Sequence, residues 1–186
     1  MASPTSFLFE PNVRLYGPIE HETVRDFLQQ LQKVRGTDNP LVLELSTEGG
    51  DADAARRIAL EVRLCRKWYN RPAYFVGKTV VMSAGITIMA AFPRECRFLT
   101  DDAVLLIHER RITKTVELKG PIRSNIQIVS ELLAQFETAE KLERDGFAEL
   151  AHESAISADE LYTRATKNFY LTAQEALKLR LIAEII

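Results

Sequence analysis

Short apolar runs alternate with segments of helical periodicity along most of this chain, and this alternation constrains the fold more than any other feature. Helical spacing of apolar residues predicts helices over His21–Val34, Asp53–Trp68, Gly85–Phe92 and about Ile122–Leu150. Strands are predicted for the short apolar runs Val13–Tyr16, Leu41–Leu45, Ala73–Val76, Phe98-Leu99, Val104–Ile107 and Leu181–Ile186. Strands that alternate with helices predict a mostly parallel α/β sheet with helices on both of its faces.

The size and charge of the chain fit one ordinary globular domain. The chain has 186 residues, of which 46% are hydrophobic, and a formal net charge of -2. That length supports one full hydrophobic core, and the composition argues against intrinsic disorder. A near-neutral charge gives no electrostatic reason to expect nucleic acid as a partner. Proteins remain open as substrates.

Two cysteines, Cys65 and Cys96, lie in apolar surroundings. We expect buried free thiols, because two unpatterned cysteines exclude a disulfide scaffold and a cysteine-rich zinc site. No basic start followed by an apolar run marks a secretory signal, and no apolar stretch approaches the roughly 20 residues that cross a bilayer. We therefore expect a soluble, cytoplasmic protein with no membrane partner.

One tempting motif, Gly77-Lys78-Thr79, looks like the end of a phosphate-binding loop. That loop needs a glycine at position 72, where this chain has Pro72, so we reject nucleotide binding.

The dipeptides His108-Glu109 and His152-Glu153 each begin the pattern of zinc proteases. Ile112 and Ile156 occupy the positions of the second histidine, so we predict no metal site and no cofactor.

Loops that follow strands carry the functional groups of parallel α/β folds, and three such loops contain candidates. Ser83 precedes a short apolar helix, where a serine is either a helix N-cap or a nucleophile beside unpaired backbone N–H groups. His108 ends a strand and is either structural or a general base. Gly49-Gly50 is either a plain turn or a backbone that can donate an N–H to a substrate.

Taken in order, these segments resemble the proteolytic subunit of Clp protease (ClpP). Ser46–Gly50 (STEGG) is similar to the family's S-P-G-G, Met82–Gly85 (MSAG) to its nucleophile segment, and Leu106–His108 to its M-I-H segment. Near the end, Leu171–Ala176 (LTAQEA) looks like the family's L-T-A-x-E-A. The resemblance covers nearly the whole chain, and the serine-to-histidine spacing is that of the family.

The resemblance implies a single ClpP-like domain over residues 1–186, with the ClpP/crotonase spiral of βαβ units and a long handle-type helix. It implies a serine endopeptidase acting on unfolded polypeptides, with Ser83 as nucleophile and His108 as general base. The third member of the triad falls on Asn168, and the N–H groups of Gly49 and Ala84 would form the oxyanion hole. It also implies a homo-oligomeric ring, heptameric or stacked, and an AAA+ unfoldase partner of the ClpX or ClpA type.

The chain departs from the family at the third triad position, because Asn168 stands where the family has aspartate. An amide oxygen can still orient His108 but supplies no charge to stabilise an imidazolium, so weaker or conditional activity is expected. Three other carboxylates are possible substitutes: Asp101, Asp102 and Asp159.

Two further departures concern assembly. Glu109-Arg110 replaces the family's Q-P, the handle region is longer, and the segment before Arg14 is short. These features weaken the expectation of ring stacking and of an unfoldase partner.

Two alternatives to the active peptidase therefore stay open. The first is a catalytically weak or inactive scaffold subunit. The second is a crotonase-type acyl-CoA enzyme or a signal-peptide-peptidase-like protein, for which Lys78 would be the only nearby lysine base.

Overall fold

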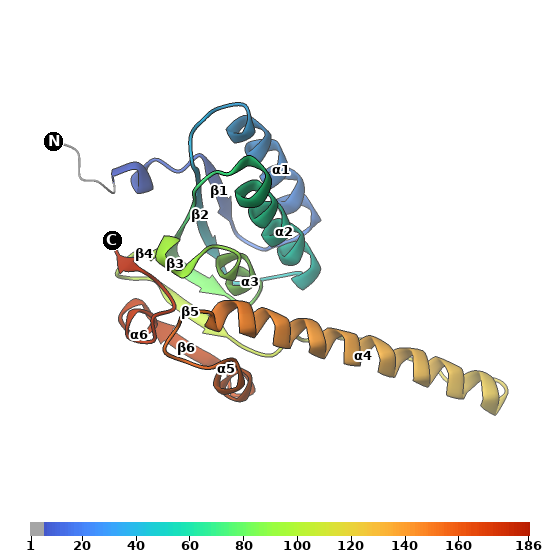
Figure 1. Cartoon of the computed structure of the whole chain (residues 1–186). Helices are drawn as coiled ribbons and strands as arrows, with labels where there is room; N and C mark the ends of the chain where they lie inside the picture. The colour runs from blue at the N-terminus through green and yellow to red at the C-terminus, as the bar shows by residue number, and fades with distance from the viewer. Residues whose placement is uncertain (1–5) are drawn as a thin grey trace.

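The computed structural model describes residues 6–186 as one twisted sheet with helices packed against it and a long helix projecting to one side (Figure 1). The strands are β1 (Val13–Tyr16), β2 (Leu41–Thr47), β3 (Ala73–Met82), β4 (Arg97–Leu99), β5 (Val104–Ile107), β6 (Phe169–Thr172) and β7 (Glu184–Ile185). The helices are α1 (His21–Arg35), α2 (Ala52–Tyr69), α3 (Ala84–Ala90), α4 (Ile122–Ala151), α5 (Ala158–Ala165) and α6 (Ala173–Lys178). Two 3-10 turns complete the set, η1 (Ser6–Phe9) and η2 (Arg94–Cys96).

The sheet is mostly parallel, as the alternation predicts. Five strands pair in the order β1-β2-β3-β4-β7, all parallel, and β5 pairs in parallel with the second half of β3. Only β6 is antiparallel, and it pairs with β5. Strand β3 is longer than the apolar run Ala73–Val76 suggests, and it therefore pairs with both β4 and β5. Its first half lies beside β4, and its second half leads to Ser83 beside β5.

The main hydrophobic core lies on one face of the sheet. Alternate residues of β2, namely Leu41, Leu43 and Leu45, point into it, and apolar residues of α1, α2 and α3 cover them. The prediction that helices cover both faces of the sheet is wrong for the face opposite the main core. There, a small cluster of Val42, Val76 and Phe98 is covered by Leu8 of η1, because β2 and β3 carry charged residues on this face farther along.

Helix α4 matches the predicted long helix and has two different halves. Near its end, Phe147 and Leu150 are buried in the main core. Its first half projects away from the sheet (Figure 1) and exposes a row of apolar side chains at helical spacing: Ile122, Ile126, Val129, Leu133 and Phe136.

The last third of the chain differs most from the predictions. Helices α5 and α6 and strand β6 were not predicted as separate elements, because each is too short to show a clear period. The predicted final strand over Leu181–Ile186 is reduced to β7, while Leu181 and Ile182 are buried in the turn before it.

Cys65 is buried as predicted, whereas Cys96 is only half-buried, and burial raises the pKa of both thiols. Among residues 6–186, no helix is long and apolar enough to cross a bilayer. No group of three or more histidine, cysteine, aspartate or glutamate side chains in the same range could hold a metal ion.

Candidate active site

Ser83 occupies a strained turn between β3 and α3. Its φ of 53° and ψ of -112° are rarely adopted by a residue with a side chain. Its N–H donates to the carbonyl of Leu106 at 2.9 Å, and its side chain makes no capping hydrogen bond to α3. Of the two interpretations of Ser83, the simple N-cap therefore has no support in the geometry. A strained strand-to-helix turn that exposes a serine is a recurring device for presenting a nucleophile.

His108 and Ser83 lie at the same edge of the sheet because of the register between two parallel strands. Met82 of β3 pairs with Leu106 of β5, so the residues that follow these two strands leave the sheet at the same edge. Ser83, Ala84 and His108 line one open cleft of about 690 Å³. The structure thus brings together three of the predicted site residues from segments about 25 positions apart.

The imidazole of His108 has a defined tautomer. Its Nδ1 lies 2.6 Å from the carbonyl oxygen of Glu109. A carbonyl only accepts hydrogen bonds, so Nδ1 carries a proton in this contact, and in the neutral form of His108 the lone pair is then on Nε2. A neutral imidazole with a free Nε2 is the form that can accept a proton from a hydroxyl.

Gly49 touches Ser83 directly. A Cβ atom added to Gly49 would lie 2.7 Å from the Cβ of Ser83, and Gly49 has a φ of +116°. Only glycine fits this position. Its own N–H, predicted for the oxyanion hole, donates to Oγ1 of Thr47 at 3.0 Å in this structure.

The neighbouring Gly50 lines the cleft, whereas Gly49 is buried behind it. A Cβ on Gly50 would lie 2.3 Å from the backbone oxygen of Ile19, so this glycine too is required by close backbone approach. Within residues 6–186, the N–H of Gly50 has no hydrogen-bond partner. The Gly49-Gly50 turn therefore offers two candidate donors, and the one at Gly50 is free.

Asn168 precedes β6 with a φ of 55° and does not reach His108 by a hydrogen bond. Its Oδ1 accepts instead from Nη2 of Arg111 at 3.2 Å. None of the three carboxylates considered as substitutes lines the cleft. Asp102, for example, accepts from the hydroxyl of Thr100 at 2.6 Å, away from the site.

Two arginines that follow His108 form a polar wall of the cleft that the sequence reasoning missed. Arg110 pairs with Asp53 of α2 at 2.9 Å, and this hydrogen bond holds the pKa of the Asp53 carboxyl below its usual range. The backbone N–H of Arg110 also donates to Glu143 of α4. Two features of the sequence pointed to them: they lie two and three positions after the candidate base, and Arg110 is part of the Glu109-Arg110 departure from the family.

Lys78 is not a candidate base. Its ammonium group pairs with the Glu44 carboxylate at 2.6 Å on the sheet face opposite the main core. Glu44 is 5% exposed and also accepts a hydrogen bond from the hydroxyl of Tyr16.

Comparison with known proteins decides the family. The family model described as Clp protease matches residues 3–186. The chain belongs to the Clp protease family.

Named members of the Clp protease family align over almost the whole chain. "ATP-dependent Clp protease proteolytic subunit 2" of Treponema pallidum is 24% identical over 97% of this chain and 84% of its own length. The protein of the same name from Pseudomonas aeruginosa is 27% identical over 91% of this chain and 78% of its own length.

A solved structure supports the fold of this family member. It is a ClpP1 variant from Listeria monocytogenes with an asparagine-to-aspartate substitution, and it superposes with a TM-score of 0.75 at 23% identity. The match covers 98% of this chain and 94% of that chain. The ClpP-type fold is therefore confirmed, and family membership decides against the crotonase-type and signal-peptide-peptidase-like alternatives.

Proposed function

We propose that this protein is a ClpP-like serine peptidase that hydrolyses peptide bonds of unfolded polypeptides. The observation that carries the proposal is the strained Ser83, which lines the same cleft as His108, whose Nδ1 contacts the Glu109 carbonyl. The relatives named as Clp protease proteolytic subunits support a peptidase of this class.

In the proposed mechanism, Oγ of Ser83 attacks the substrate carbonyl while Nε2 of His108 takes its proton. His108 then returns that proton to the leaving amine, and water repeats the sequence on the acyl-enzyme. The N–H of Ala84 and one N–H of the Gly49-Gly50 turn would hold the developing oxyanion.

Asn168 completes the proposed triad as an orienting amide in place of a carboxylate. In the present structure the Glu109 carbonyl already fixes the tautomer that His108 needs. Asn168 would act only after Nδ1 of His108 leaves the Glu109 carbonyl and the Asn168 oxygen, now bonded to Arg111, comes within its reach. This arrangement fits weak or conditional activity.

We also propose that the protein works as a homo-oligomeric ring. The exposed apolar row on α4, five side chains that are each 44–77% accessible, supports self-association through that helix. Because the relatives are named as subunits of an ATP-dependent protease, an unfoldase of the ClpX or ClpA type is the proposed partner. Extended substrate would pair with an exposed strand by backbone hydrogen bonds.

The test is covalent labelling with a fluorophosphonate, read by intact mass and by the modified peptide. A single adduct on Ser83, absent from Ser83→Ala and present in the matched control Ser124→Ala, is expected. Ser124 is an exposed serine on α4, far along the chain from the cleft. His108→Ala should remove labelling without unfolding the protein. Labelling that survives in Ser83→Ala would overturn the assignment of the nucleophile.

The second candidate is a catalytically silent scaffold subunit, favoured by the hydrogen bond that commits Asn168 to Arg111. An assembled sample, verified by light scattering, that leaves Ser83 unlabelled would support this alternative.

A further inference from the structure

Arg97 of β4 is a buried arginine whose partners are all backbone carbonyls. The residue is 2% exposed, and within residues 6–186 no carboxylate lies within ion-pair distance of it. Nε donates to the carbonyl of Phe92 at 2.8 Å and Nη2 to that of Ala90 at 3.0 Å. Nη1 donates to the carbonyls of Leu150 and Leu181, both at 3.2 Å.

Three of these carbonyls lie at or just after the ends of two helices, and the fourth, of Leu181, lies in the turn between α6 and β7. Ala90 is the last residue of α3 and Phe92 follows it closely, while Leu150 lies in the last turn of α4. The final carbonyls of a helix have no partner within it, and they carry the negative end of its dipole. A guanidinium satisfies them and supplies the opposite charge. We call Arg97 and the carbonyls of Ala90, Phe92, Leu150 and Leu181 the Arg97 clamp.

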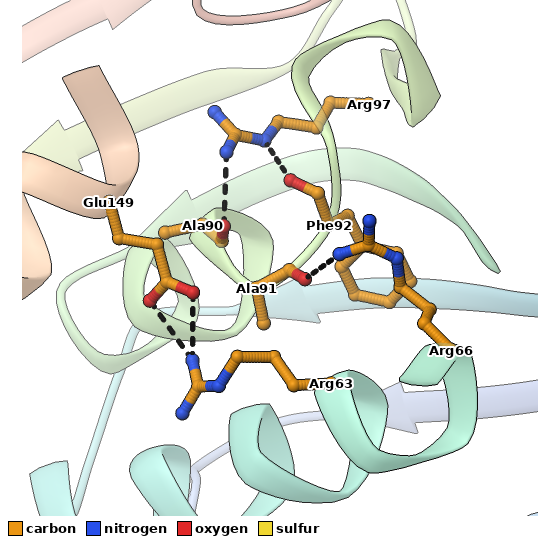
Figure 2. Close-up of polar contacts among 7 residues, drawn as sticks. All are labelled: Arg63, Arg66, Ala90, Ala91, Phe92, Arg97 and Glu149. Atoms are coloured by element: carbon orange, nitrogen blue, oxygen red, sulfur yellow. Dashed lines mark hydrogen bonds and ion pairs between the residues drawn. The ribbon is translucent and has the colours of Figure 1, made fainter. Parts of the chain in front are cut away.

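Two arginines of α2, Arg63 and Arg66, bind groups next to the clamp (Figure 2). Arg66 of α2 donates to the carbonyl of Ala91 at 3.3 Å, so the three carbonyls that end α3 all accept from arginine side chains. Arg63 of α2 binds both oxygens of Glu149, at 2.9 and 3.0 Å, and so joins α2 to the last turns of α4.

Helix α3 is short, and its apolar side chains pack in the main core, while the hydrogen bonds that tie it to other elements are at its ends. Its side chains are apolar except for Thr87, which makes no hydrogen bond among the described residues. At the first end, the N–H of Ser83 is tied to β5, and at the other end the Arg97 clamp holds the carbonyls. The seven residues of α3 therefore set the distance between Ser83 at one end of the helix and the Arg97 clamp at the other.

We propose that Arg97 is a positioning residue that sets the place of Ser83 through α3 and couples it to the last turn of α4. The inference rests on the proposed function, because it assumes that Ser83 is the nucleophile. A nucleophile must be held within about 0.5 Å of its productive place, and a shift of about 1 Å can reduce the rate 100-fold. Burial lowers the pKa of Arg97 to about 10, so the guanidinium stays charged at neutral pH.

The test compares Arg97→Lys with two controls by fluorophosphonate labelling of Ser83, well below every melting temperature. Lysine keeps the charge but cannot serve four carbonyls from one planar group. We expect the labelling rate to fall about 10- to 100-fold. Arg66 donates to one carbonyl only, so the labelling rate should fall less in Arg66→Lys than in Arg97→Lys. Leu31→Ala, a core truncation in α1, should lower the melting temperature without slowing the reaction.

A second readout is hydrogen exchange of the unmodified protein. If the Arg97 clamp joins the two helices, amides of α3 and of the last turn of α4 should open as one cooperative unit. This measurement remains decisive if Arg97→Lys does not fold.

The possible outcomes separate the two proposals. An equal labelling rate in Arg97→Lys and the unmodified protein, or independent opening of α3 and α4, would overturn the positioning role while leaving the peptidase assignment intact. Failure of the unmodified protein to react at Ser83 would overturn the peptidase assignment, and the catalytic consequence of the clamp with it.

Discussion

Arg111 donates a hydrogen bond of 3.2 Å to Oδ1 of Asn168, the atom that the proposed triad needs for His108. Both residues are exposed, and only Arg111 lines the cleft, so the contact between them can exchange with solvent. The proposed triad therefore predicts that Arg111, a residue outside it, influences the reactivity of Ser83.

For Asn168→Asp, we expect labelling of Ser83 to stay equal or to rise by less than about tenfold, a step of ~1.4 kcal/mol. The new carboxylate would gain charge but would also pair with Arg111. Adding Arg111→Met should release it and raise the rate further. The rates of the two single variants and the double variant form a cycle that measures this coupling. Additive effects would show that Arg111 does not restrain position 168.

Gly49→Ala should strongly reduce labelling of Ser83. The new Cβ would lie 2.7 Å from the Cβ of Ser83 and would demand a φ of +116° from alanine. Strain of this kind costs about 1–3 kcal/mol, and here it falls on the nucleophile itself. The labelling rate measures the effect of the clash on Ser83, and the melting temperature measures the loss of stability from the strained backbone.

Gly146→Ala is the matched control for that variant. Gly146 is helical, lines the opposite part of the same cleft on α4 and has nothing within 4 Å of an added Cβ, so alanine there should stabilise α4 by about 0.5–1 kcal/mol without any contact with Ser83. A normal rate in Gly49→Ala would mean that the glycine turn does not press on Ser83 in solution.

Removing the partner of a buried carboxylate should destabilise the fold. Lys78→Met leaves Glu44, which is 5% exposed, without its ammonium partner at 2.6 Å, and we expect a loss of about 3–5 kcal/mol. The double variant Glu44→Leu with Lys78→Met should be more stable than Lys78→Met alone, because no charge remains buried. Urea denaturation measures all three proteins. If the double variant had no larger free energy of unfolding than Lys78→Met alone, the Glu44–Lys78 pair would be effectively solvated.

The same carboxylate gives stability a pH dependence. Burial acts to raise the pKa of Glu44, but hydrogen bonds from Lys78 and Tyr16 outweigh it and hold the pKa below its usual value. The folded pKa lies below the unfolded one, so the stabilisation is present above about pH 4.3 and is lost as the pH falls through the folded pKa. Glu44→Gln should therefore be less stable at pH 7 and lose less stability on acidification. Parallel pH profiles of the free energy of unfolding for the two proteins would contradict this.

A charge placed in the apolar row of α4 should disrupt self-association without unfolding the chain. Ile126 is 60% exposed in the middle of the first half of the helix, so Ile126→Glu loses no core contacts. We expect a smaller mass by light scattering and an unchanged melting temperature of the subunit. Ser124→Glu, on the opposite side of the helix, is the control. Equal masses for both variants would place the association surface elsewhere.

The sequence alone determined the elements whose patterns are long or regular. Helical spacing over His21–Val34 and from Ile122 onward matched α1 and α4 closely, and the apolar runs of β1, β2 and β5 were correct. Family motifs around Ser83 and His108 led to the right fold, because short segments in a fixed order are specific even where each alone is weak. The same reasoning missed α5, α6 and β6, whose few residues are stabilised by packing against β5 rather than by their own periodicity.

Only the tertiary structure decided which groups meet. Parallel pairing of Met82 with Leu106 brings Ser83 to the same edge as His108, and nothing local to either segment specifies that register. Asn168, Lys78 and Arg97 find most of their partners 34 or more positions away in the chain, as Lys78 does with Glu44. The type of a residue determines which hydrogen bonds it can donate or accept. Its partner is determined by the packing of the whole core, because a buried polar group can bond only to the neighbours that the fold places beside it.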